Sequence, residues 1–347
     1  MNPAITDPAP TFWRHGDGTF RKRLTVGKAA RETAGWRAIA AHLTVPDMLE
    51  TISHSGGQQT LVWEDVFASG RCHQTLADAI CRADQDHQTG PVTNLVGDIC
   101  DALLKAQANT GASSSIGGCH PGLYAARLAP GGRVDQWYGH LGPVTIDTGA
   151  RALTLDIPHL LDRTRADLSP ERLCATAITQ GDPTEPNIAD PLCWLDYEHA
   201  GRNALAGDVA ILLWYLLAMG GWLVPTYKPA TYAATVTSPR PPLHPLVTHA
   251  RIDGDRVDIC AQLRAGAGRR AALDALVARL RGDLGAALGG DPAQALRAWL
   301  VVRILGVLPL TAMSPTDRAV CLLKLAELAD GRELEDFSAT APTTENP

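Results

Sequence analysis

The stretch that decides the fold of this chain reads Gln180-Gly181-Asp182-Pro183-Thr184-Glu185-Pro186-Asn187-Ile188 and then, after a short gap, Cys193-Trp194-Leu195-Asp196-Tyr197-Glu198. Residues 174–179 before it are strand-like, so we expect Asp182 and Asn187 on a loop that leaves a strand. Asp196 is expected at the end of the next strand. Two carboxylates and an amide that meet at strand ends are hard oxygen ligands, which suit Mg²⁺ and one proton acceptor. Taken one at a time, however, such residues beside prolines are more often simple turn formers.

The spacing of these residues separates them from ordinary turns, because Asn187 follows Asp182 by five positions and Asp196 follows Asn187 by nine. This spacing resembles the aminoglycoside phosphotransferases and related small-molecule kinases of the protein-kinase-like fold. Their pattern is H-G-D-x-x-x-x-N, then a hydrophobic strand ending in I-D-W/F/Y-E, then A-G and a D before a helix. The matching residues here are Gly181-Asp182, Asn187-Ile188, Leu195-Asp196-Tyr197-Glu198, Ala200-Gly201 and Asp208, with Gln180 where the family usually has His.

The resemblance implies a role for each matched residue. It makes Asp182 the catalytic base toward an acceptor hydroxyl, and it makes Asn187 and Asp196 the residues that hold Mg²⁺ on the nucleotide phosphates. The position of Gln180 mainly orients the loop. Asp208 is expected to be a helix N-cap, and Glu198 either assists the metal or substrate or starts a helix.

A lysine near the N-terminus gives an independent indication. Residues 12–14 and 19–24 flank a Gly16-Asp17-Gly18 turn and predict a hairpin. Alternate residues of a strand share a face, so Lys22 points with the apolar Phe20 and Leu24. The neighbouring Arg21 and Arg23 point to the opposite face.

A glutamate in the next element is expected to meet this lysine. Residues 29–43 predict an amphipathic helix in which one stripe holds Glu32, Trp36, Ile39 and Leu43. A carboxylate on an apolar stripe is costly to bury unless it is paired. Both charges could instead extend to the edge of the lobe. The resemblance favours the pair and implies that Lys22 grips the α- and β-phosphates and is oriented by Glu32.

The connection between the lobes is expected at residues 60–66, where the family links its two lobes. The resemblance therefore makes the backbone near Glu64 and Val66 a candidate adenine contact, although an edge strand would give the same pattern. A G-x-G-x-x-G phosphate loop is absent from the sequence. Either the first strand and its loop are reduced, or backbone groups near His15–Gly18 cover the phosphates.

The predicted fold class is α+β, a bilobal protein-kinase-like fold. We expect a flexible segment at residues 1–11, a β-rich nucleotide-binding lobe at 12–66, a mainly helical lobe at 67–336 with the catalytic loop, metal and substrate sites, and a disordered tail at 337–347. From residue 205 onward helices are expected to dominate, apart from a proline-rich interruption around residues 239–245.

Composition limits the cellular setting. The chain has 347 residues and a net charge of −6, which does not suit a nucleic-acid or anionic-membrane partner. Its eight cysteines are scattered without metal spacing, which favours a reducing compartment. The start has no signal-peptide pattern, and the longest uncharged apolar run, residues 209–224, is short for a bilayer span and predicts a buried helix. We therefore expect a cytoplasmic protein without membrane or nucleic-acid partners.

The resemblance implies an ATP-dependent (or GTP-dependent) and Mg²⁺-dependent kinase that acts on a hydroxyl of a small molecule, with an antibiotic as the first candidate and resistance or self-protection as its role. Six acids against one arginine between residues 181 and 208 suit a cationic aminoglycoside, but residues 251–300 carry eight arginines against six acids. A nucleoside antibiotic, a sugar or another small metabolite therefore remains an alternative acceptor. A catalytically silent binding protein is a further alternative, but it would be expected to have lost Asp182, Asn187 or Asp196.

Overall fold

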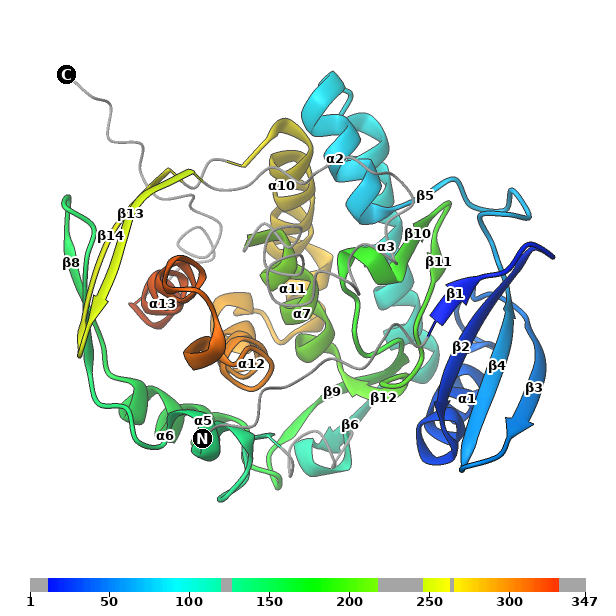
Figure 1. Cartoon of the computed structure of the whole chain (residues 1–347), viewed down its shortest axis with the longest axis horizontal. Coiled ribbons are helices and arrows are strands. Elements are labelled where there is room, and N and C mark those ends of the chain that lie inside the picture. The colour runs from blue at the N-terminus through cyan, green and yellow to red at the C-terminus, as the bar shows by residue number, and fades with distance from the viewer. Residues whose placement is uncertain (1–11, 120–126, 218–245, 263–264, 331–347) are drawn as a thin grey trace.

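The computed structural model describes residues 12–119, 127–217, 246–262 and 265–330. A small β-rich lobe with one helix lies at one end of the molecule, and a larger part with most of the helices forms the rest (Figure 1). This arrangement confirms the predicted bilobal α+β architecture. The segments 1–11 and 337–347, which the sequence predicts to be flexible, lie outside the described residues.

The small lobe is an antiparallel sheet with the strand order β1-β2-β4-β3 and one helix. Its elements are β1 (Phe12–Arg14), β2 (Thr19–Thr25), α1 (Val26–Ile39), β3 (Met48–His54) and β4 (Gln58–Glu64). The predicted hairpin is present, with Phe12 opposite Lys22. The predicted helix is shifted toward the N-terminus because Thr25 caps it by accepting a hydrogen bond from the Lys28 N–H. It ends at Ile39, so Leu43 lies beyond it.

Two small sheets of the larger part carry the decisive stretch of sequence. One has the order β12-β9-β6 and the other the order β11-β10-β5. Their strands are β5 (Gln74–Thr75), β6 (Ala112–Ser115), β9 (Leu173–Thr179), β10 (Ile188–Asp190), β11 (Cys193–Trp194) and β12 (Gly201–Ala204), with the 3₁₀ turns η1 (Ile116–Gly118) and η2 (Glu185–Asn187). The loop 180–187 therefore leaves strand β9, as predicted, and Asp196 follows β11.

A four-stranded sheet at the far edge of the larger part was not predicted. Its order is β13-β14-β7-β8, and its strands are β7 (Val144–Asp147), β8 (Ala152–Leu155), β13 (Leu246–Asp253) and β14 (Arg256–Gln262). The expectation that helices dominate after residue 205 is therefore wrong for the β13–β14 hairpin. The signal was present, because Gly254 with its positive φ of 59° makes the turn between two alternating strands. The proline-rich residues 239–245 lie outside the described residues.

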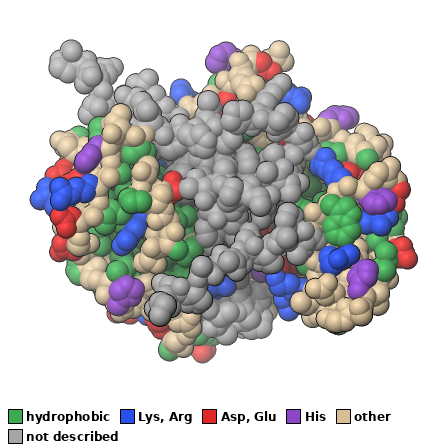
Figure 2. All heavy atoms as spheres, viewed as in Figure 1, with side chains coloured by type: hydrophobic (Ala, Val, Ile, Leu, Met, Phe, Trp, Pro, Cys, Tyr) green, Lys and Arg blue, Asp and Glu red, His purple; other side chains and the backbone are tan. Residues whose placement is uncertain are grey.

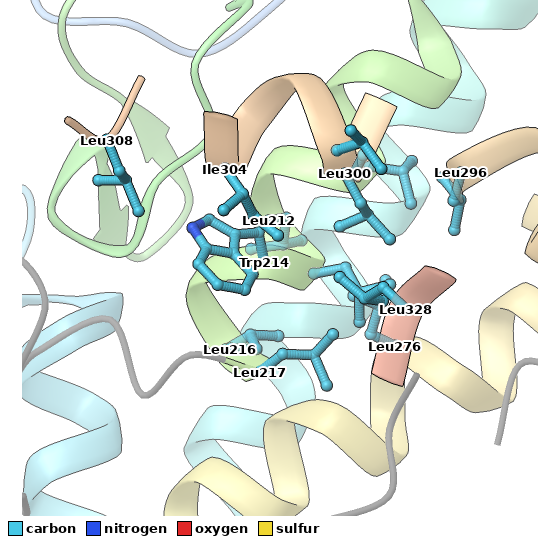
Figure 3. Close-up of a cluster of buried hydrophobic side chains, with 14 of the residues drawn as sticks. Leu212, Trp214, Leu216, Leu217, Leu276, Leu296, Leu300, Ile304, Leu308 and Leu328 are labelled. Carbon is cyan, nitrogen blue, oxygen red and sulfur yellow. The ribbon is translucent and has the colours of Figure 1, made fainter. Parts of the chain in front are cut away.

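Helices fill the space between the sheets (Figure 1). They are α2 (Leu76–Asp86), α3 (Gly90–Thr110), α5 (Arg133–Tyr138), α6 (Ile157–Asp167), α7 (Leu205–Leu217), α10 (Ala267–Arg281), α11 (Asp283–Ala287), α12 (Pro292–Leu305) and α13 (Pro315–Asp330), with the 3₁₀ turn η3 (Leu310–Ala312). In the core, Leu212 and Trp214 of α7 face Leu300 and Ile304 of α12 (Figure 3). The tight packing of apolar side chains fixes these two helices relative to each other.

One segment of the larger part has the length and apolar composition of a membrane span. It runs from Pro292 to Ala312, and 67% of its most apolar 18-residue window is buried inside the protein. Leu296, Leu300 and Ile304 from this segment belong to the core cluster (Figure 3). The segment therefore packs as the central helix of a folded core. The apolar run that the sequence singled out, residues 209–224, is likewise a buried helix over its described part, which ends at Leu217.

Candidate active site

The structure brings Lys22 together with two carboxylates from different parts of the chain. Its Nζ donates hydrogen bonds to Glu32 Oε2 and to Asp196 Oδ1, both at 2.7 Å. Glu32 is only 3% exposed and Lys22 15%, whereas Asp196 is 43% exposed. The predicted contact between Lys22 and Glu32 is present, and Asp196 joins it from the larger part of the molecule. A single lysine thus links the small lobe to the segment after β11.

The small lobe builds its half of this contact by local periodicity. Strand β2 directs Lys22 inward, while Arg21 binds the carboxylate of Asp17 at 2.6 Å in the β1–β2 turn. Helix α1 buries Glu32 together with Gly35 on the same face. A Cβ at Gly35 would lie 2.1 Å from the carbonyl oxygen of Tyr197, so a glycine is required for this close approach.

The approach of α1 also ties Glu32 to the backbone beside Asp196. The N–H of Tyr197 donates to Glu32 Oε1 at 3.3 Å. The ring of Trp63 lies 5.1 Å from the ring of Tyr197 and 6.0 Å from the ring of Trp36. These aromatic contacts hold β4, α1 and the Asp196 segment in one unit.

The charges in this cluster shift one another's protonation. Burial alone would lower the pKa of Lys22, but Asp196 and Glu32 raise it above its usual value. Burial raises the pKa of Glu32 despite the attraction of Lys22. For Asp196 burial acts in the same direction, but Lys22 outweighs it and the pKa is lowered. The lysine is therefore a firmly held cation shared by two acids.

Gln180 clamps the loop 180–187 to the Asp196 segment. Its amide nitrogen Nε2 donates to the carbonyl of Leu195 at 2.8 Å and to that of Asp196 at 2.5 Å. Its amide oxygen accepts the N–H of Asp182 at 2.8 Å. An amide supplies donor and acceptor together at any pH, so Gln180 can make these three contacts at the same time.

Gly181 allows the loop to turn sharply. Its φ is +83°, and a Cβ there would lie 2.0 Å from the carbonyl oxygen of His199 and 2.7 Å from Asn203 Nδ2. An L side chain would meet both an unfavourable backbone conformation and a clash with backbone. The turn sets the direction in which Asp182 leaves the loop.

Asn187 and Asp196, the two candidate metal ligands, lie on neighbouring segments. Strands β10 and β11 pair antiparallel, and the N–H of Leu195 donates to the carbonyl of Asn187 at 2.8 Å. The amide nitrogen of Asn187 donates to the carbonyl of Asp182 at 3.0 Å, which leaves its amide oxygen as the group for a cation. Asp196 has a positive φ of 60°, a conformation that non-glycine residues adopt mainly where the surroundings impose it.

These two side chains fit Mg²⁺ only as part of a larger set. Among the described residues, no group of three or more His, Cys, Asp or Glu side chains could hold a metal ion by itself. Mg²⁺ characteristically binds one or two protein oxygens and completes its shell with phosphate oxygens and water. One carboxylate and one amide oxygen are therefore a suitable donor set when a nucleotide supplies the rest.

Asp208 does not cap a helix, which corrects the sequence expectation. Helix α7 begins at Leu205, so Asp208 lies within its first turn, where it is buried. Burial raises its pKa to about 7, although hydrogen bonds from the Thr179 side chain and the Gly181 backbone lower it and nearby Asp182 raises it further. Asp208 supports the loop 180–187 from below.

Asp182 has a cationic partner that the sequence analysis missed. Nη1 of Arg303 lies 2.8 Å from Asp182 Oδ1, and the two side chains are 9% and 23% exposed. Arg303 also reaches Tyr215 of α7, with Nη2 at 3.4 Å from the hydroxyl and the guanidinium carbon 5.3 Å from the ring centre. The signal was an arginine inside an apolar helix, because such a buried cation requires a counter-charge.

A second buried ion pair fixes the middle of the same loop. Glu185 accepts hydrogen bonds from Arg269 of α10 at 2.5 Å and 3.4 Å, and both residues are almost fully buried. Arg269 also donates to the backbone carbonyl of Tyr215 at 3.1 Å. The loop is thus anchored to α10 and to the C-terminal end of α7.

The two residues proposed for adenine contact lie at the end of β4. Glu64 places its carboxylate 2.6 Å from Arg71 Nη1, and its N–H donates to the carbonyl of Asp47 at 2.9 Å. Val66 is buried, and its carbonyl accepts the N–H of Cys72 at 2.8 Å.

The β1–β2 turn lies at this same end, because the N–H of Asp65 donates to the Gly18 carbonyl at 3.2 Å. Its Asp17 carboxylate accepts hydrogen bonds from the Thr19 N–H and hydroxyl. Residues 15–18 are therefore beside the lobe connection rather than beside Lys22. Of the two sequence alternatives, a phosphate cover from this turn is not favoured.

The remaining charged residues singled out by the sequence have structural partners. Glu198 lies in a turn and pairs with Arg31 of α1 at 3.0 Å, so it does not start a helix. Four of the arginines of residues 251–300 pair with acids, in Arg251–Asp253, Arg256–Asp258, Arg269–Glu185 and Arg279–Asp283. On the face shown in Figure 2, side chains of both signs are interspersed at both ends of the molecule.

Comparison with known proteins gives matches only among solved structures, all at low sequence identity. No protein-family model matches the chain, and no curated protein matches it. Among solved structures, glucosamine kinase bound to glucosamine, ADP and inorganic phosphate matches 91% of this chain over 77% of its own, with 15% identity and a TM-score of 0.48. A mutant of aminoglycoside phosphotransferase APH(4)-Ia bound to ADP and hygromycin B matches 92% of this chain over 94% of its own, with 11% identity and a TM-score of 0.49.

A third solved structure, aminoglycoside phosphotransferase APH(3'')-Id from Streptomyces rimosus, matches 76% of this chain over 87% of its own, with 15% identity and a TM-score of 0.37.

Proposed function

We propose that this protein is an ATP-dependent phosphotransferase that phosphorylates a hydroxyl group of a small molecule. The observation that carries the proposal is the shared position of Lys22 between Glu32 and Asp196, at 2.7 Å from each, beside the loop that bears Asp182 and Asn187. A cation, a metal-ligand pair and a proton acceptor at the junction of two lobes are the parts that phosphoryl transfer requires.

Each residue has a physical task in this reaction. Lys22 binds the α- and β-phosphates, and Glu32 keeps its ammonium group in place from the buried side. Asp196 and Asn187 hold Mg²⁺, which would neutralise charge on the phosphates. Asp182 accepts the proton of the acceptor hydroxyl, while Gln180 keeps its loop in register with Asp196. Positioning and charge neutralisation supply most of the catalysis.

The nucleoside end of the site follows from the lobe connection. Because the Glu64 N–H and the Val66 carbonyl are already bound within the protein, an adenine would contact the Glu64 carbonyl and the Val66 N–H.

The setting and the acceptor belong to the same proposal. All eight cysteines are free thiols, which supports a cytoplasmic enzyme. A hydroxylated antibiotic is the first candidate acceptor, with resistance or self-protection as the role, and a nucleoside antibiotic, sugar or other metabolite is the alternative. A silent binding protein is disfavoured, since Asp182, Asn187 and Asp196 are all present in a consistent geometry.

Replacement of Asp182 by Ala tests the function. Mg·ATP affinity, measured by titration calorimetry, should stay within a few-fold of wild type, while ADP release with an acceptor panel should fall by about 10²–10⁴, the usual value of a positioned base. Asp162→Ala, at an exposed position on α6, is the matched control and should change neither quantity. A wild-type protein that does not bind Mg·ATP would refute the proposed function, and an Asp182→Ala variant with near-normal turnover would remove Asp182 from the role of base.

A further inference from the structure

The partner of Asp182 is unusual for a site that would receive a cationic acceptor. Arg303 is 9% exposed and its Nη1 lies 2.8 Å from Asp182 Oδ1. That oxygen is fully buried and accepts no aligned hydrogen bond, so the accessible part of the Asp182 carboxylate is the side of Oδ2. Arg303 therefore stands directly behind the group that would meet the acceptor hydroxyl.

The guanidinium is held in this position by two packed helices. Trp214 of α7 and Ile304 of α12 belong to the buried cluster of Figure 3 and adjoin Tyr215 and Arg303 in the sequence. Tyr215 supplies both a hydroxyl, 3.4 Å from Nη2, and a ring face for the guanidinium. Arg303 cannot swing away from Asp182 without disturbing the contact between α7 and α12.

The other titratable groups near Asp182 do not restore a negative charge. Glu185 is neutralised by Arg269 at 2.5 Å. Tyr215 is a neutral phenol whose pKa is raised by burial. Asp208 is buried beneath the loop, and its raised pKa of about 7 leaves it partly protonated at neutral pH. On the side of Asp182 that faces α7, α10 and α12, the described acids are thus compensated by Arg269 and Arg303 or buried beneath the loop.

We propose that Arg303 is a specificity-determining residue. It selects an acceptor that carries a neutral or anionic group, rather than an ammonium group, next to the hydroxyl that meets Asp182. The inference rests on the proposed function and names the substrate class of the same site. The charge of the Asp182 carboxylate is already balanced by the guanidinium behind it, so an ammonium beside that hydroxyl would gain little attraction from Asp182 and would be repelled by Arg303.

Three two-carbon alcohols of matched size test this inference: ethanolamine, ethylene glycol and glycolate. They differ in charge and are small enough to reach Asp182 whatever the shape of the natural acceptor. Each is incubated with Mg·ATP at fixed ionic strength, and two quantities are measured: the phosphorylated alcohol by mass spectrometry, and the change in ADP release relative to water alone. Wild type should give the largest response with glycol or glycolate, and a response to ethanolamine lower by about tenfold or more.

Variants of Arg303 separate charge from structure. Arg303→Met should raise the response to ethanolamine relative to glycolate by about tenfold or more, and Arg303→Lys, which keeps the charge, should retain the wild-type order. Arg303→Gln, which keeps a donor toward Asp182 without the charge, provides the same comparison if the Met variant does not fold. Arg163→Met, at an exposed position on α6, is the control for loss of a surface arginine.

The outcomes distinguish this inference from the proposed function. Equal responses to the three alcohols, a preference for ethanolamine in the wild type, or an order that is unchanged when the charge of Arg303 is removed would overturn the role of Arg303. A loss of equal size for all three alcohols would also overturn it, because it would mean that Arg303 acts on folding or on the phosphoryl group alone. Absence of Mg·ATP binding in the wild type would instead refute the proposed function itself.

Discussion

Replacement of Glu32 by Gln tests how the small lobe holds its lysine. Glu32 is 3% exposed and binds both Lys22 Nζ at 2.7 Å and the Tyr197 N–H at 3.3 Å. Glutamine has the same shape and can still accept the Tyr197 hydrogen bond through its oxygen. The substitution therefore removes one charge from the cluster with little change in packing. Lys22 would then keep only Asp196 as its partner.

The structure sets the size of the expected effect. Breaking a buried ion pair so that one charge is left alone costs about 3–5 kcal/mol. Here Lys22 is 15% exposed and retains Asp196, so we expect the free energy of unfolding to fall by less, roughly 1–3 kcal/mol. Nucleotide binding should be weakened as well, because a lysine drawn to Asp196 occupies a metal ligand. We expect Mg·ATP affinity to fall by about 10–100-fold.

A double-mutant cycle measures whether Lys22 and Glu32 act together. The variants are Lys22→Met, Glu32→Gln and the pair, with Mg·ATP affinity measured by titration calorimetry and stability by urea unfolding. Residues in one network are not additive, so the double variant should lose about 1–2 kcal/mol less than the sum of the single losses. Two variants are matched controls. Arg21→Met replaces the neighbouring cation of β2, which binds Asp17 rather than Glu32, and Glu50→Gln replaces an acid at an exposed position of β3.

Additive losses for Lys22 and Glu32 would refute this reasoning. So would a greater loss of Mg·ATP affinity at Arg21 than at Lys22, because it would mean that the nucleotide lies on the opposite face of β2. Equal effects of Glu50→Gln and Glu32→Gln would show that the lobe responds to its net charge rather than to this contact.

Three further predictions concern the larger part of the molecule. Asp196→Ala should weaken the Mg²⁺ dependence of ATP binding more than Asn187→Ala, because a carboxylate gives a hard cation a full charge and an amide only a dipole. ATP titrations with and without Mg²⁺ measure this dependence, and equal effects of the two variants would contradict the assignment of these residues as metal ligands. Gly181→Ala should lower turnover by a larger factor than nucleotide affinity, since a Cβ would lie 2.0 Å from the His199 carbonyl and would displace first Asp182, the next residue. A loss of affinity as large as the loss of kcat would contradict this expectation. The pKa of Asp208 is raised from 3.8 to about 7, so its contribution to stability is present below pH 4 and is lost as the pH rises through 7. Asp208→Asn should remove this loss of unfolding free energy, which is on the order of 4 kcal/mol between pH 4 and pH 8. Unfolding curves with identical pH dependence in both proteins would contradict this prediction.

The features predicted correctly from the sequence are those set by local rules. Strand alternation alone turns Lys22 away from Arg21, and helix periodicity alone places Glu32 on the buried stripe. The loop 180–187 could be recognised because its spacing is contiguous in the chain. The β13–β14 hairpin also followed a local rule, the Gly254-Asp255 turn, and was missed because its neighbours β7 and β8 lie about a hundred residues earlier in the chain.

Asp208 shows why a residue's role is harder to predict than its element. An acid before an apolar run is a good N-cap in isolation, and the expected helix start at residue 209 followed from that rule. The helix instead begins at Leu205, because α7 packs its first turn against the loop after β9. The carboxylate is then buried inside the helix, where Thr179 and Gly181 donate to it. Tertiary packing decided the role, and no local pattern of residues 205–209 distinguishes the two outcomes.

Arg303 shows what the sequence could and could not reveal. An arginine within the apolar run of α12 must be paired, because an isolated buried guanidinium is too costly to keep. The run itself therefore predicts that a carboxylate lies opposite. Its identity depends on the contact of α12 with α7, which places Arg303 against a loop 121 positions earlier in the chain (303 minus 182). The sequence of the helix thus predicts that Arg303 has a counter-charge, whereas only the fold determines that this counter-charge is Asp182. Because Asp182 is the proposed base, this pairing places a residue of the core helix next to the acceptor.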